Sequence, residues 1–196
     1  MDNQVSRAGI ILAGGASRRF GSPKAIARWE GKTFIERAID TLTPFCDTIL
    51  VVAHHELMSE LNQYSSKQVQ IICDDPHFTG KGPLAGMYSG MTKVKADYYL
   101  VSPCDMPLMS SEMYQKWLDA AIDEEYECVV PVLNGKIYPL NGIYTYSCLL
   151  DITFCLQKDI YKVLDLLNRK RTYFIKADKD DEAYFKNVNT VEDLHS

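Results

Sequence analysis

The segment Ala8-Gly9-Ile10-Ile11-Leu12-Ala13-Gly14-Gly15-Ala16-Ser17-Arg18-Arg19-Phe20-Gly21-Ser22-Pro23-Lys24 joins an apolar run to a glycine-rich, basic loop. The run Ala8–Leu12 does not alternate between apolar and polar residues, which is typical of a strand buried on both faces. Glycines let the backbone of the loop approach a ligand, and consecutive N–H groups bind anions. The cationic side chains add the charge that a polyphosphate requires. A phosphate-binding loop is therefore favoured, with a tight turn and solvated arginines as the alternative.

Four further apolar runs predict buried strands, at Thr48–Ala53, Val69–Cys73, Tyr98–Ser102 and Cys128–Val132. Between the strands, apolar residues recur with helical spacing over residues 34–42, 84–91 and 113–121, and Ser110 can cap the last of these helices. Alternation of strands and helices predicts an α/β fold, a three-layer α/β/α sandwich with a mostly parallel, Rossmann-like sheet.

The last third of the chain is less regular. Its pattern predicts a strand or hairpin in Lys136–Tyr146, a helix over Asp159–Asn168 and a strand at Thr172–Ala177. Asp178–Glu182 reads as a solvated run of charges, and Thr190 can cap a short final helix. Ligands of open α/β sheets bind beyond the carboxyl ends of the strands, which is where functional residues are expected.

Length and composition restrict the class of protein. The 196 residues fit one domain, and the 46% hydrophobic and 24% charged residues are ordinary for a soluble globular chain. A net charge of -5 argues against broad nucleic-acid binding. The first apolar run is too short for a signal peptide or a membrane span, so we expect a cytoplasmic protein without membrane contact. Its six cysteines form no C-x-x-C pair and are expected to be free thiols.

A carboxylate follows the predicted strand at Tyr98–Ser102, in Pro103-Cys104-Asp105-Met106-Pro107. The two prolines restrict the backbone around Asp105, at the carboxyl end of the strand. Because Mg²⁺ is commonly held by one or two carboxylates together with phosphate oxygens and waters, Asp105 is a candidate metal ligand. The alternative is an aspartate in a turn shaped by proline.

A second acidic segment, Asp74-Asp75-Pro76, follows the strand at Val69–Cys73 and precedes Gly82-Pro83-Leu84-Ala85-Gly86, where Pro83 can begin a helix. The glycines would let the backbone approach a flat base or its ribose. Loop carboxylates that cap a turn are the alternative. His54 and His55 end another strand and suggest a metal site, but adjacent side chains of an extended segment diverge, so a solvated pair is expected.

The pattern Leu12-Ala13-Gly14-Gly15-x-Ser17-x-Arg19-Phe20-Gly21-x-x-Lys24 resembles the signature of the molybdenum cofactor guanylyltransferase family, a group of nucleotidyltransferases. The resemblance extends from Ala8 to Leu194 and is strongest in this loop, in Cys104-Asp105-Met106-Pro107 and in Asn187-Val188-Asn189-Thr190. Pro23 stands where many relatives have an aspartate, so that ligand is missing here.

The resemblance implies a division of roles along the chain. The N-terminal half would bind the NTP and the C-terminal half the acceptor, within one domain spanning residues 1–196. Arg19, Lys24 and Asp105 would be catalytic, and Asp105 would hold Mg²⁺. Asn187 and Asn189 would bind the acceptor. The implied nucleotide-binding residues are Leu12, Ala13, Gly14, Gly15, Lys24, Asp75, Gly82, Pro83, Leu84 and Asp105.

The activity implied is transfer of GMP from GTP to the terminal phosphate of molybdopterin. GTP and molybdopterin are then the expected partners, and contact with other cofactor-biosynthesis or target proteins stays open. Many relatives select the base with an asparagine where this chain has Val52, Ala53 or His54, so a cytidylyltransferase remains an alternative. A nucleotide-binding module without catalysis is an alternative of another class.

Overall fold

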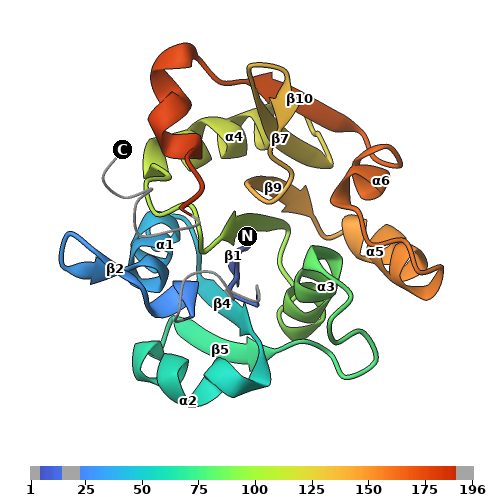
Figure 1. Ribbon diagram of the computed structural model, residues 1–196. Helices are drawn as coiled ribbons and strands as arrows, with labels where there is room; N and C mark the ends of the chain where they lie inside the picture. Colours follow the sequence, from blue (N-terminus) through green and yellow to red (C-terminus); the bar gives the residue numbers. More distant parts are fainter. Residues whose placement is uncertain (1–4, 15–22, 189–196) are drawn as a thin grey trace.

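The computed structural model describes residues 5–14 and 23–188, so the helix expected after Thr190 lies outside the described residues. An eight-stranded sheet forms the centre of the molecule, and helices cover both of its faces (Figure 1). Seven strands follow the order β10-β7-β9-β6-β1-β4-β5, and β8 pairs with β7. The predicted fold class is confirmed.

Four parallel strands form one half of the sheet: β1 (Arg7–Leu12), β4 (Thr48–Ala53), β5 (Val69–Cys73) and β6 (Tyr98–Pro103). β1 lies between β4 and β6, with Ile10 paired to Leu50 on one side and to Val101 on the other. Because these strands are parallel, their carboxyl ends meet at one edge of the sheet. The loop with Gly14, which follows β1, and the turn with Asp105, which follows β6, therefore lie at the same edge of the sheet.

The other half of the sheet contains β7 (Cys128–Leu133), β8 (Lys136–Ile137), β9 (Gly142–Thr145) and β10 (Thr172–Lys176). β9 runs antiparallel between β6 and β7, and β10 pairs in parallel with β7. The segment Lys136–Tyr146, expected to form a strand or a hairpin, contains two strands that do not pair with each other. β8 pairs with β7, whereas β9 lies between β6 and β7. A further two-stranded sheet pairs β2 (Arg28–Trp29) with β3 (Lys32–Thr33).

Six α-helices are described: α1 (Phe34–Leu42), α2 (Met58–Leu61), α3 (Pro83–Lys93), α4 (Ser111–Asp123), α5 (Cys148–Gln157) and α6 (Val163–Leu167). Four 3₁₀ helices are also described: η1 (Lys24–Ile26), η2 (His55–Leu57), η3 (Asn62–Tyr64) and η4 (Lys179–Phe185). α1 and α4 pack on one face of the sheet, and α3, α5 and α6 pack on the other.

The central strands are buried on both faces, as the lack of alternation predicts. Ile10 and Ile11 are both fully buried, although they point to opposite sides. Ile11 belongs to the core with α1 and α4, whereas Ile10 belongs to the core with α3 and α5. The register of β1 therefore fixes both helical layers at once.

Local capping explains where two of the helices begin. Ser110 caps α4, with its Oγ accepting a hydrogen bond from the Glu112 amide at 3.1 Å, as expected. Thr33 caps α1 in a reciprocal arrangement with Glu36, because the Thr33 amide donates to Glu36 Oε2 at 2.6 Å.

One expectation for the C-terminal third needs correction: the helix expected over Asp159–Asn168 is only α6, since Asp159 has a φ of 55° and follows the end of α5. The sequence pattern does not predict α5, because Cys148–Gln157 is apolar on most sides and lacks a clear helical stripe. The charged run at Asp178–Glu182 is solvated, as expected, and its residues from Lys179 onward also begin η4.

Two remaining expectations concern the membrane and the cysteines. Within the described part of the chain, no helix is long and apolar enough to cross a bilayer. All six cysteines are free thiols, and all of them except Cys73 are buried.

Close packing between α3 and β1 generates a stability prediction. A Cβ added at Gly90 would lie 2.7 Å from Cδ1 of the fully buried Ile10, so even alanine overpacks this contact. We expect Gly90→Ala to lower the free energy of unfolding by about 1–3 kcal/mol in urea denaturation, despite the higher helix propensity of alanine. Thr92→Ala, at an exposed position of the same helix, should change stability by less than about 0.5 kcal/mol. A Gly90→Ala protein as stable as the parent would contradict this packing.

Candidate functional site

A cavity of about 330 Å³ lies at the carboxyl ends of β1, β4 and β6. Its apolar lining includes Leu12, Val52 and Leu57, and Leu140 closes it from the loop before β9. Its size lies at the lower end of the range of about 300–1,000 Å³ for small-molecule sites. Its location is where open α/β sheets bind ligands.

The loop after β1 supplies one wall of this cavity. Leu12, Ala13 and Gly14 line it, and the Ala13 amide donates to the Val52 carbonyl at 2.8 Å, which ties the start of the loop to β4. A Cβ added at Gly14 would meet no described heavy atom within 4 Å, so there is room for a ligand against its backbone. Gly15 and Arg19 lie outside the described residues.

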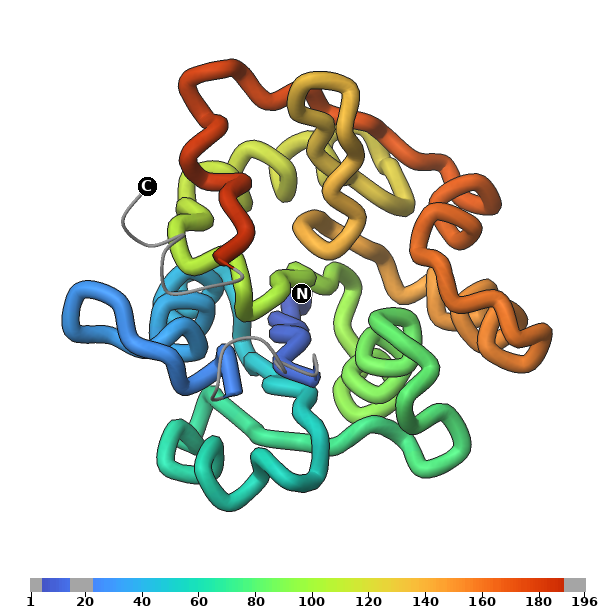
Figure 2. The backbone as a smooth tube through the Cα atoms, viewed as in Figure 1, coloured from blue at the N-terminus to red at the C-terminus, as the bar shows by residue number. Residues whose placement is uncertain are grey.

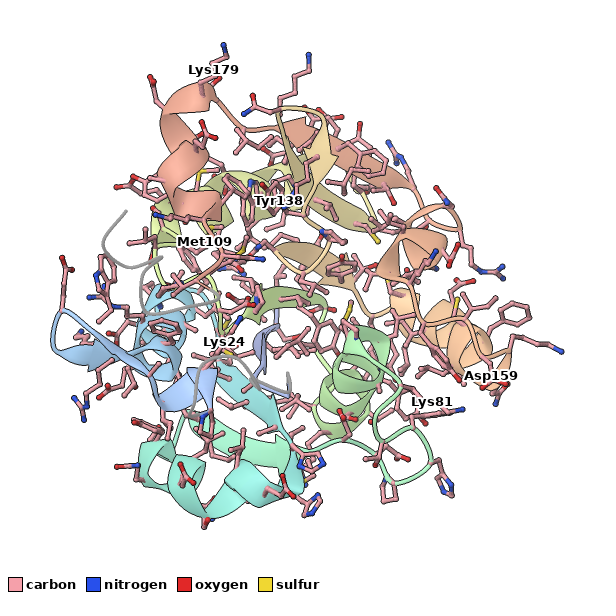
Figure 3. All side chains as sticks on the ribbon, in the orientation of Figure 1. Lys24, Lys81, Met109, Tyr138, Asp159 and Lys179 are labelled. Atoms are coloured by element: carbon pink, nitrogen blue, oxygen red, sulfur yellow. The ribbon has the colours of Figure 1, made fainter. Side chains whose placement is uncertain are left out.

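A lysine and a carboxylate meet across the cavity. Lys24 begins η1, directly after Pro23, and its Nζ lies 3.4 Å from Oδ2 of Asp105 (Lys24 is labelled in Figure 3). Their side chains are 17% and 29% exposed, so solvent screens the pair less than it screens a surface pair. The arrangement offers both a cation and a carboxylate to a polyphosphate with its metal ion.

The turn that carries Asp105 is held in place by its neighbours. The Cys104 amide donates to the Leu12 carbonyl at 3.2 Å, and the Cys104 and Met106 side chains are buried on either side of Asp105. Asn141 donates from Nδ2 to the Met106 sulfur, and it is itself 1% exposed. Burial raises the pKa of Cys104 to about 12, so this thiol stays protonated and is no nucleophile. Asn141 was not singled out from the sequence, because a lone Asn-Gly also reads as a turn.

The two neighbouring aspartates after β5 occupy different environments. Asp74 lines the cavity, and burial raises the pKa of its carboxyl, while a hydrogen bond from the Gly80 backbone and the nearby His54 act in the opposite direction. Asp75 is not among the lining residues. Its amide donates to Ser89 Oγ at 2.8 Å, and its Oδ1 accepts from the His77 amide at 2.9 Å, as in a capped turn. The family resemblance implies Asp75 as the nucleotide ligand, whereas Asp74 is the residue that lines the cavity.

The amino end of α3 forms another part of the lining. Gly80, Gly82, Pro83 and Gly86 face the cavity, whereas Leu84 is fully buried in the core behind them. Gly82 has a φ of 76°, a conformation that favours glycine, and Pro83 occupies the first turn of the helix.

The far side of the loop that precedes α3 is tied to the connection between α5 and α6. Lys81 Nζ contacts Asp159 Oδ1 at 3.0 Å, and Figure 3 shows both residues at the periphery of the molecule. This surface ion pair attaches a wall of the cavity to the C-terminal half of the chain.

The C-terminal segment returns to the site (Figure 2). Phe185, at the end of η4, packs against Tyr138 with ring centroids 4.8 Å apart. Val188 is buried, and its amide donates to the Asp105 carbonyl at 2.9 Å. Asn187 is exposed immediately before this contact, so the structure brings it close to Asp105. Asn189 lies outside the described residues.

The histidines after β4 do not behave as expected. Their ring centroids lie 4.2 Å apart, because the chain turns into η2 at His55 and does not stay extended. The expectation that the side chains of His54 and His55 diverge is therefore wrong, although both remain accessible to solvent.

Seven of the ten residues expected to bind the nucleotide converge on the cavity. These seven are Leu12, Ala13, Gly14, Lys24, Gly82, Pro83 and Asp105. Among the others, Leu84 and Asp75 lie outside the lining and Gly15 lies outside the described residues.

Comparisons with known proteins agree with this arrangement. The family model described as "MobA-like NTP transferase domain" matches residues 9–172. The chain is 38% identical to the "Probable molybdenum cofactor guanylyltransferase" of Halalkalibacterium halodurans, over 98% of each chain. It is 40% identical to a protein of the same name from Bacillus cereus, over 95% of this chain and 92% of that protein.

A solved structure shares the fold. The molybdopterin-guanine dinucleotide biosynthesis protein A of Archaeoglobus fulgidus superposes with a TM-score of 0.78 and 23% identity, over 96% of this chain and 95% of that chain. The resemblance drawn from the sequence motifs is confirmed: the chain is a nucleotidyltransferase and belongs to the MobA-like NTP transferase family.

Proposed function

We propose that the protein transfers GMP from GTP to the terminal phosphate of molybdopterin, releasing pyrophosphate. The observation that carries this proposal is the convergence of Gly14, Lys24 and Asp105 on one cavity. Relatives at 38–40% identity carry the name of this activity. A single nucleotidyltransferase domain over residues 1–196, acting in the cytoplasm, completes the proposal, and the free thiols agree with a reducing compartment.

The chain's own residues act by placing and neutralising charge. The acceptor phosphate is already ionised, so in-line attack on the α-phosphorus requires no protein base. The backbone after Leu12 positions the phosphates, and Lys24 offsets the negative charge of the departing pyrophosphate, helped by Arg19. Such catalysis depends on preorganised contacts, which the anchored turn around Asp105 provides.

The donor set near Asp105 fits Mg²⁺. Asp105 supplies a carboxylate oxygen at the cavity, and Mg²⁺ typically binds one or two protein carboxylates, with phosphate oxygens and waters as its other ligands. When bound, the ion would supply Lewis-acid stabilisation of charge on the phosphate oxygens. Lys24 contacts the same carboxylate and would keep it oriented toward the cavity.

The acceptor side of the proposal involves the C-terminal segment. Asn187 lies beside the Asp105 turn, because the amide of the next residue, Val188, donates to the Asp105 carbonyl. Asn189 is proposed as a second acceptor ligand from the sequence motif alone. Amide side chains both donate and accept hydrogen bonds, which suits the edge of a pterin.

The choice of base is tested by comparing GTP with CTP. With purified protein, Mg²⁺ and molybdopterin, we expect pyrophosphate release with GTP that exceeds release with CTP by at least about tenfold. A preference for CTP would establish a cytidylyltransferase. Nucleotide binding without pyrophosphate release from any NTP would establish a module without catalysis.

Substitutions of the ion pair test the catalytic assignment. Loss of a contact to developing charge typically costs about 2.7–4 kcal/mol, so we expect Asp105→Ala and Lys24→Ala each to lower kcat at least about 100-fold. The exposed pair Lys32–Asp40, with N···O at 2.6 Å, provides matched controls. Lys32→Ala and Asp40→Ala should leave kcat within about twofold. Near-parental kcat in either site variant would remove that residue from its role.

The two aspartates after β5 can be separated by kinetics. A charged hydrogen bond contributes about 1.5–3 kcal/mol, so if Asp74 holds the nucleotide, Asp74→Asn raises the KM for GTP by roughly tenfold or more. Asp75→Asn should change this KM by less than about threefold, because its carboxylate caps a turn. The reverse ranking would assign the contact to Asp75, as the family resemblance implies.

A further inference from the structure

Three metal-ligating side chains gather beyond the end of β4, directly before Leu57, which lines the cavity. His54, His55 and Glu56 each offer one donor atom, and these atoms lie within 4.8 Å of one another. His54 Nδ1 is 3.4 Å from Glu56 Oε2, with these side chains 42% and 75% exposed. The 3₁₀ turn of η2 produces this cluster, since an extended chain would send neighbouring side chains to opposite sides.

The spacing can be compared with that of a zinc centre. Bonds of about 2.0–2.2 Å in a tetrahedron place neighbouring ligand atoms about 3.3–3.6 Å apart. The 3.4 Å between His54 and Glu56 already equals one edge of such a tetrahedron. The widest separation in the cluster is at most 4.8 Å, and metal binding would require side-chain rotation to bring these atoms to that spacing. His55 and Glu56 are exposed, and His54 is half-buried.

The ligand chemistry separates this cluster from the one around Asp105. Two imidazoles and a carboxylate suit Zn²⁺ and neighbouring transition metals, whereas Mg²⁺ prefers oxygen ligands alone. An acidic side chain also lies near the cluster. The register pairs Ala53 with Cys73, so His54 and Asp74 follow neighbouring strands at the same edge of the sheet.

We propose that His54, His55 and Glu56 form a binding site for Zn²⁺ beyond the end of β4, separate from the proposed Mg²⁺ ligand Asp105. Val52 and Leu57, which flank the cluster in the chain, both line the cavity, and so does Asp74. A divalent charge placed there acts on the same space that the nucleotide would occupy. By linkage, any change that Zn²⁺ makes in nucleotide affinity is returned as an equal change in Zn²⁺ affinity.

The test measures Zn²⁺ binding directly and does not depend on the proposed activity. The starting protein carries Cys73→Ser, because Cys73 is an exposed thiol and a competing zinc ligand. We expect isothermal titration with Zn²⁺ at pH 7.5 to show one site per chain with a dissociation constant in the micromolar range, unchanged by millimolar Mg²⁺.

Matched variants locate the site. The double variant His54→Ala/His55→Ala should weaken Zn²⁺ binding at least about tenfold, since even loss of an outer-shell partner costs 10–100-fold. His77→Ala, at another exposed histidine, and Asp105→Asn should leave the affinity unchanged. Circular dichroism checks that each variant is folded. Absence of micromolar binding in the starting protein, or equal binding by the double histidine variant, would overturn the proposal.

Discussion

The burial of β1 on both faces is the constraint on which the rest of the structure depends. Ile10 and Ile11 enter opposite cores, so a slip of the strand by one residue would force each side chain into the core that is packed around the other. Its hydrogen bonds to β4 and β6 complete the restraint. The loop that begins at Leu12 therefore leaves the sheet at a fixed point, where a backbone that binds phosphate gains most from being immobile.

Asp105 depends on parts of the chain that are far apart in sequence. Its turn bonds to β1 through Cys104, rests on Met106 and Asn141, and accepts a hydrogen bond from Val188. These contacts fix the backbone and leave the carboxylate at the cavity facing Lys24. A carboxylate placed in this way requires little rearrangement when phosphate arrives, which is the property that charge-stabilising catalysis requires.

Sequence reasoning identified the elements whose patterns are local. The five strands predicted from apolar runs and the helix capped by Ser110 are confirmed. These patterns are readable because hydrophobic periodicity and helix capping depend on residues that are close together in the sequence. The antiparallel position of β9 was not predicted, since only tertiary packing places four residues between β6 and β7. Within the site, the glycine loop, Lys24 and Asp105 followed from motif and strand position. Asp74 and Asn141 did not, because their surroundings are set by segments that fold onto them.

The placement of β9 also has a consequence for the order of assembly. Among the described strands, β7 pairs only with those that follow it in the chain, namely β8, β9 and β10, whereas β1, β4, β5 and β6 can pair once residues 7–103 have left the ribosome. The first half of the sheet can therefore form during synthesis, before β8, β9 and β10 are available to pair with β7. The seam from Tyr98–Thr145 to Val101–Gly142 then joins the two halves late. Since Asp105 lies just beyond this seam and its carbonyl accepts a hydrogen bond from Val188, the cavity is complete only after residues 142–188 have folded onto the first half.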